Sequence, residues 1–353
     1  MDGPSVNWSF IEKLKNKLER DPGDPDLLDL GSCSLHIVHG AFQTSGKASG
    51  FDISHQLVSL YYLFHDSPAR RDDYTKLTSS TSFPLKFCAH RWIENGPVAD
   101  RAIQIWKNVK KYVTDIKQKP DNRSFKVVKE SVSDPLAIAK LSFFVSVVSH
   151  LQRFLTMFQG DRPLVTFLCD EVHAILRSVM TRFIKTSVLK EADTVLKLCK
   201  IDCEDTKNHK DYKNIDVGFA VNAVLQSEPK TVSDLQKMSF CTGCTKFLAA
   251  MMAKLLQRNP LQYSLARNLS CLSPKGLAAS PETYTANFKK VLAVLLAKKH
   301  FTADQCDAAG RQFATFCEKV VRKKSEEFIS FKETKLKVTD ADRLDEFYGK
   351  FSH

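Results

Sequence analysis

Cysteine and histidine side chains near the start of the chain have the spacing of metal ligands. Cys33 and His36 form a C-x-x-H pattern in an apolar segment that is predicted to be helical. Zinc takes four nitrogen or sulfur donors, and the further donors that could join this pair are His39, His55, Cys88 and His90. The alternative is a structural motif, because residues three apart share one face of a helix. We expect this structural role for Cys33 and His36, and no bound metal.

A second cysteine pattern lies in the second half of the chain. Cys241 and Cys244 form a C-x-x-C, and Cys199 and Cys203 could add two thiolates for zinc. A redox pair is a further alternative. However, the C-x-x-C begins an apolar helical segment, where cysteine packs as a small hydrophobic residue. The pattern therefore favours packing over zinc or redox chemistry.

Lysine and arginine are concentrated between Asp100 and Glu130, with nine basic against four acidic side chains. Lys107, Lys110 and Lys111 lie within a helix predicted over 98–113. Segments 289–299 and 319–324 are also basic. Such segments could follow a phosphate backbone, with an affinity that falls as salt rises. The alternative is an ordinary solvated helix surface.

Apolar residues at helical spacing predict a mainly α protein that positions these side chains, because strand patterns are rare. The predicted helices cover 8–18, 33–42, 57–64, a segment that begins at Pro68, 98–113, 141–158, 164–189, 240–256, 284–296 and 303–328. One short buried strand is predicted at 27–30, an extended segment at most at 83–87, and loops at 117–129 and 199–214.

Length and composition limit the classes of protein. The chain has 353 residues, 43% of them hydrophobic, with ten cysteines and a formal net charge of +12. This size allows two or three domains, and the charge favours anionic partners such as nucleic acid. We recognise no secretory leader, and the apolar run 141–148 is shorter than the roughly 20 residues of a membrane helix. We therefore expect a soluble intracellular protein with reduced cysteines.

The order of motifs in the first third of the chain resembles the hAT superfamily of cut-and-paste DNA transposases. Cys33-x-x-His36, Ser67-x-x-Arg70 and Arg91-Trp92 occur in the order of that family's series. The resemblance implies an incomplete RNase H-like α/β remnant over residues 1–115, followed by a large all-helical, insertion-like domain over 130–353. It also implies that Arg91 and Trp92 contact DNA. A tryptophan in an apolar pattern is also common in a core, and this alternative stays open.

The segment around Asp2, which runs Asp-Gly and reaches Asn7, resembles the second catalytic aspartate of the family. The resemblance implies that Asp2 is a vestigial ligand of a divalent cation such as Mg²⁺, in a site built of three carboxylates. We expect the other two to be missing, and therefore no enzyme activity and no retained metal. An alternative is a metal-dependent nuclease that uses Asp24, Asp26 or Asp29.

These observations predict a truncated, catalytically incompetent, transposase-derived protein of the nucleus with residual, sequence-independent DNA binding. The residues expected to bind nucleic acid are Arg91, Trp92, Lys107, Lys110 and Lys111. A homo-oligomer is a further expectation, and no membrane partner is expected. A small-molecule substrate is not expected either, because no P-loop, nucleophile elbow or dinucleotide motif occurs. The alternative is an all-α protein-interaction scaffold without nucleic-acid binding, in the nucleus or the cytoplasm.

Overall fold

The computed structural model describes residues 5–18, 24–28, 30, 33–159, 162–227, 232–332 and 342–351. Within these ranges the chain is mainly helical and contains no β-sheet. Its β pairing is limited there to an isolated antiparallel bridge between Ile184 and His209. The predicted mainly α class is therefore confirmed. Asp2 lies outside the described residues.

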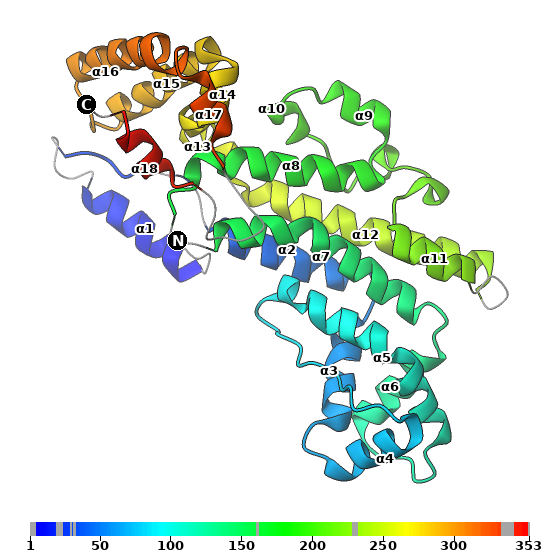
Figure 1. The fold of residues 1–353 in the computed structure, drawn as a ribbon. Helices are drawn as coiled ribbons and strands as arrows, with labels where there is room; N and C mark the ends of the chain where they lie inside the picture. The colour runs from blue at the N-terminus through cyan, green and yellow to red at the C-terminus, as the bar shows by residue number, and fades with distance from the viewer. Residues whose placement is uncertain are drawn as a thin grey trace. The chain divides into compact units, whose positions relative to one another are not determined.

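The chain divides into two units, whose helices are labelled in Figure 1. Unit 1 comprises residues 1–37, 153–176 and 256–353, and unit 2 comprises 38–152 and 177–255. The boundaries fall within four helices, α2 (Ser34–Ala48), α7 (Ala137–Phe158), α8 (Val165–Phe183) and α12 (Asp234–Arg258). The predicted domains 1–115 and 130–353 follow from the family resemblance and stay a prediction.

Unit 2 contains parts of these four helices and a set of shorter ones. They are α3 (Ile53–Phe64), α4 (Pro68–Thr78), η1 (Trp92–Asn95), α5 (Gly96–Asp115), α6 (Arg123–Ser133), α9 (Thr186–Glu191), α10 (Val195–Leu198), η2 (Thr206–Asn208), η3 (Tyr212–Asn214) and α11 (Phe219–Ser227). Proline begins α4 as predicted, because the first turn needs no N–H donor there. The loop predicted at 117–129 is wrong from Arg123 onwards. The Asn122 side chain accepts the Phe125 N–H at 2.8 Å and so caps α6.

Aromatic rings of α2, α7 and α12 form the core of unit 2. Phe42 packs edge-on against Phe144 and Phe247, with centroid distances of 5.1 and 5.2 Å. Phe51 stacks on Phe240 at 5.5 Å. A side chain at Gly243 would come within 2.6 Å of the Phe51 ring, so the glycine between Cys241 and Cys244 permits this close packing.

A buried arginine fixes the end of α8 in unit 2. The Arg182 side chain is 2% exposed, and it donates to the Asp216 carbonyl at 2.9 Å and to the Ser146 hydroxyl at 3.1 Å. The helix predicted over 164–189 is interrupted after Phe183, because Lys185 donates its backbone N–H to Asn208. This exchange of backbone partners was not visible in the apolar spacing.

Unit 1 contains the remaining helices. They are α1 (Ser5–Leu18), η4 (Pro260–Gln262), α13 (Ser264–Asn268), η5 (Leu269–Leu272), α14 (Pro274–Ala279), α15 (Pro281–Ala297), α16 (Ala303–Phe316), the π-helical turn η6 (Cys317–Val321), α17 (Ser325–Ser330) and α18 (Leu344–Gly349). The single helix predicted at 303–328 is therefore split by a π turn. A Thr302–Gln305 capping box begins α16.

The core of unit 1 is rich in phenylalanine. Phe328 contacts Phe347 edge-on at 5.0 Å and stacks on Phe351 at 5.3 Å. Phe331 packs on Phe347 at 5.1 Å, and Val321 of the π turn is fully buried in the same cluster. These contacts attach α17 and α18 to the π turn.

The short strand predicted at 27–30 is wrong for Leu27, Leu28 and Leu30, which have no regular structure. Leu28 is 38% exposed. A strand needs a partner for its backbone groups. Here Asp26 instead donates its N–H to the Lys298 carbonyl at 3.0 Å, and its own carbonyl lies 2.7 Å from His300 Nε2. The segment is thus bound to the α15–α16 connection.

Helix α7 has the length and apolar composition of a membrane span, and within the described ranges it is the one helix that does. In its most apolar window, 56% of the residues are buried inside the protein. Core packing accounts for such a composition equally well. The expectation of no membrane partner stays a prediction.

Candidate nucleic-acid interface

A buried asparagine shapes the turn that carries Arg91 and Trp92. The Asn95 amide accepts the Cys88 N–H at 2.7 Å and donates to the carbonyls of Cys88 at 2.9 Å and Trp92 at 3.0 Å. This amide is completely buried. It closes segment 88–95 into a compact loop just before α5. Sequence inspection gave Asn95 no role, because its partners are backbone groups that no pattern reveals.

Arg91 and Trp92, which were predicted to contact DNA together, have different environments. Trp92 is 8% exposed, packs edge-on against Phe87 at 5.4 Å, and would meet any side chain at Gly46 at 2.7 Å. Its ring therefore belongs to the core of unit 2. Arg91 is exposed and pairs with Glu94 at 3.1 Å. A base could not stack on Trp92 without opening this packing.

Helix α5 presents the three predicted lysines to solvent. Lys107, Lys110 and Lys111 are exposed, whereas Val109 and Tyr112 on the opposite face are fully buried. No acidic side chain in the described part of the chain pairs with these lysines. Burial raises the pKa of the Tyr112 hydroxyl to about 12. The helix predicted over 98–113 is confirmed, and it extends from Gly96 to Asp115.

Two of these lysines border a groove, which we call the α5–α7 groove. Its volume is about 620 Å³, and it is lined by Trp106, Lys107, Lys110, Val132, Ser133, Asp134, Pro135, Ile138 and Val224. These residues come from α5, from the end of α6, from the α6–α7 connection, from the start of α7 and from α11. Lys111 does not line it. The apolar part of the lining could not be foreseen, because Val224 lies far from α5 in the sequence.

A neighbouring hollow extends the positive surface along α6. It has a volume of about 490 Å³ and is lined by Lys126, Lys129, Glu130, Ser133 and Asp134. Ser133 and Asp134 line both depressions, so lysines flank this connection on two sides. The two linings together contain four lysines and two acidic side chains.

One of these carboxylates is already engaged. Asp134 accepts the Leu136 N–H at 2.9 Å and pairs with Lys140 at 2.7 Å. Lys126 pairs with Asp121 at 2.9 Å, and this pair lowers the pKa of the Asp121 carboxyl. Lys107, Lys110 and Lys129 find no such partner within the described ranges. The surface therefore keeps positive charge for an external anion.

Several cysteines of the two predicted patterns are buried or half-buried. Cys244 is fully buried, and burial raises the pKa of its thiol and of the Cys241 thiol. Burial also raises the pKa of Cys203 to about 12. These shifts oppose the thiolate form that zinc binding and redox exchange require. Cys33 is half-buried and His36 is exposed.

Candidate metal ligands do not gather in the described residues, where no group of three or more His, Cys, Asp or Glu is placed to hold an ion. Asp26 is bound by Lys298 at 3.3 Å. Asp2 and Asp29 lie outside the described residues, so their predicted roles are not tested.

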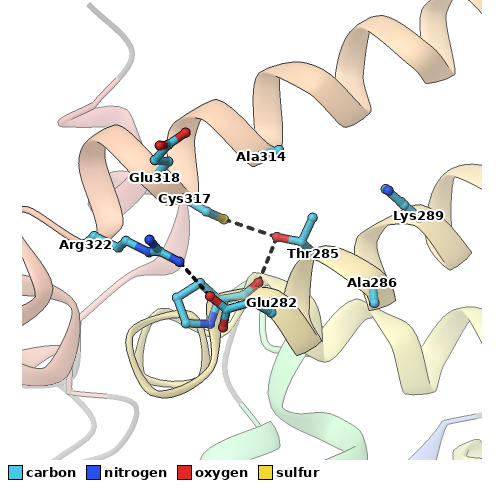
Figure 2. A pocket seen from close by; sticks show the side chains of 9 residues that line it. Glu282, Thr285, Ala286, Lys289, Ala314, Cys317, Glu318 and Arg322 are labelled. Atoms are coloured by element: carbon cyan, nitrogen blue, oxygen red, sulfur yellow. Dashed lines mark hydrogen bonds and ion pairs between the residues drawn. The ribbon is translucent and has the colours of Figure 1, made fainter.

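Unit 1 has a cavity of its own, of about 460 Å³, between α15, α16 and the π turn (Figure 2). Arg322 pairs with Glu282 at 2.6 Å across it. The Thr285 hydroxyl lies 2.8 Å from the Pro281 carbonyl and 3.7 Å from the Cys317 sulfur. Arg322, Glu282 and Thr285 thus have hydrogen-bond or ion-pair partners among the residues of this cavity.

Comparison of the chain with models of known protein families, with curated proteins and with solved structures finds no match.

Proposed function

We propose that this protein binds nucleic acid without sequence preference, through the basic surface of unit 2. The observation that supports the proposal is the group of exposed lysines without acidic partners, Lys107, Lys110 and Lys111 on α5 and Lys129 on α6. Phosphate contacts by lysine hold a duplex but do not distinguish bases. No aromatic ring of the predicted site reaches this surface, because Trp92 is buried.

The proposed ancestry is a hAT transposase, with an RNase H-like remnant in the first third of the chain. The order Cys33-x-x-His36, Ser67-x-x-Arg70 and Arg91-Trp92 supports it. We propose binding rather than catalysis as the function, and the nucleus as the place. These points depend on the sequence resemblance alone.

The experiment is fluorescence anisotropy of the full chain with two unrelated DNA duplexes, in low and in physiological salt. We expect the same affinity for both sequences and a logarithmic slope against salt of about −0.9 for each phosphate contacted. An affinity that does not depend on salt, or no binding even in low salt, would contradict the proposal. An interaction scaffold would then be the better description.

A further inference from the structure

The floor of the α5–α7 groove is apolar, and an apolar surface does not bind phosphate. Trp106, Val132, Ile138 and Val224 supply apolar surface to it, and all four are buried or half-buried. Phosphate groups bind to charged and polar donors, whereas five of the nine lining side chains here are apolar or aromatic. A ligand that fills the groove must therefore bring apolar side chains.

The rim of the groove specifies the charge of that ligand. Lys107 and Lys110 are one helical turn apart, exposed, and not paired with any acidic group among the described residues. Asp134 does not offset them, because it is held by Lys140 and by the Leu136 N–H. Carboxylates above an apolar face are the complement of this rim.

We propose that the α5–α7 groove is a docking site for an acidic amphipathic helix of a protein partner. Apolar side chains of that helix enter the groove, and its carboxylates meet Lys107 and Lys110. Apolar anchors then supply most of the affinity, and the rim charges set orientation and partner choice.

The walls of the groove favour a helix over a strand as the occupant. They consist of α5, the end of α6, α7, α11 and the α6–α7 connection, with no strand edge in the part of the chain that the structure describes. An extended peptide gains much of its affinity from pairing with such an edge. A helix instead satisfies its own backbone and presents side chains at three- and four-residue spacing.

The test uses the full chain and three labelled synthetic peptides of about 18 residues, long enough to be partly helical alone. The first has a leucine stripe flanked by glutamates, the second has the same residues in scrambled order, and the third has lysine for every glutamate. We expect the first to bind at least about tenfold more tightly than either of the others. If the scrambled peptide bound equally well, charge alone would explain the interaction, and the inference would be overturned.

Two variants locate the peptide. Lys107→Glu with Lys110→Glu reverses the rim charge, and Ile138→Ala shortens a floor side chain without changing charge. Each should lower the affinity for the first peptide by about tenfold, whereas Lys289→Glu with Lys319→Glu in unit 1 should leave that affinity unchanged. An unchanged affinity in the Ile138→Ala variant would contradict the inference.

The floor variant also separates this inference from the proposed nucleic-acid binding. Ile138→Ala keeps every lysine, so duplex DNA should bind to it as to the natural chain. Binding of DNA together with failure of all three peptides would overturn the docking site and leave the nucleic-acid proposal intact. Binding of the first peptide without DNA binding would do the reverse.

Discussion

The two concave surfaces described in units 1 and 2 have similar sizes but different charge. The cavity of unit 1 has two acidic and two basic side chains in its lining, and Arg322 is paired with Glu282. The α5–α7 groove of unit 2 has Lys107 and Lys110 at its rim, and Lys140 holds its carboxylate. Charges that neutralise one another do not attract an anion. The comparison therefore favours unit 2 for the proposed binding of an anionic partner.

The most severe test of this comparison reverses the charges of α5. Lys107→Glu, Lys110→Glu and Lys111→Glu together should weaken duplex binding by about 100-fold at physiological salt, because three phosphate contacts are lost. Anisotropy titrations measure the effect.

The matched control is Lys289→Glu, Lys319→Glu and Lys323→Glu in unit 1, which changes the net charge equally. Its affinity should fall far less. Equal losses in the two triple variants would mean that net charge alone controls binding, and the distinction between the units would disappear.

A second test separates the core from the surface within unit 2. Trp92→Phe should lower the free energy of unfolding by about 1–2 kcal/mol, because the smaller ring leaves space beside Gly46 and Phe87. DNA affinity of the folded protein should stay the same. Urea unfolding and anisotropy measure the two quantities. A large loss of DNA affinity at unchanged stability would instead support the DNA contact at Trp92 that the transposase resemblance implies.

A third test adds positive charge to the cavity of unit 1. Glu282→Gln with Glu318→Gln leaves Arg322 and Lys289 without acidic neighbours in the lining. We expect DNA affinity to rise by no more than about threefold, since two isolated cations contribute few phosphate contacts. A gain in DNA affinity as large as the loss in the triple α5 variant would show that the unit 1 cavity can bind DNA as well as the unit 2 surface does.

The smallest effect at neutral pH is expected from a substitution of Tyr112, which lies on the buried face of α5. Tyr112 has no hydrogen-bond partner for its buried hydroxyl among the described residues, so Tyr112→Phe should be neutral or stabilise by about 1 kcal/mol. DNA binding should be unchanged, because this variant alters no charge at neutral pH.

The same tyrosine predicts alkaline sensitivity. Its pKa is 10.0 when unfolded and about 12 in the fold, so the folded state holds the proton more tightly. This stabilisation is complete below pH 10 and is lost as the pH rises through 12. Unfolding midpoints of Tyr112→Phe should decline less steeply over that interval. Identical declines in both proteins would contradict the assignment.

The sequence predicted the features that depend on local spacing. Pro68 at the start of α4, the apolar face of α7 and the helix α5 all follow from helical periodicity. The preference for packing at Cys241 and Cys244 agrees with a buried Cys244 and a half-buried Cys241. These features need no information about distant residues.

Features that depend on distant partners were missed. The strand at 27–30 failed because Asp26 exchanges hydrogen bonds with Lys298 and His300. The long helix at 164–189 failed because Lys185 takes Asn208 as its backbone partner. No spacing in the sequence reveals such contacts.

The groove itself is the clearest example of this limit. Its basic rim was predicted from Lys107 and Lys110, but its apolar floor was not. Ile138 and Val224 reach the floor from separate helices, and only their packing in unit 2 brings them beside Trp106. The sequence therefore predicted the charge of the candidate site but not its shape.

The most direct test of the central claim is a lysine footprint of the full chain with and without duplex DNA. Brief acetylation followed by mass spectrometry reports the reactivity of lysines in both units at once. We expect DNA to protect Lys107, Lys110, Lys111 and Lys129, and to leave Lys289, Lys319 and Lys323 as reactive as before. Protection confined to unit 1, or spread equally over both units, would contradict the assignment of the nucleic-acid surface to unit 2.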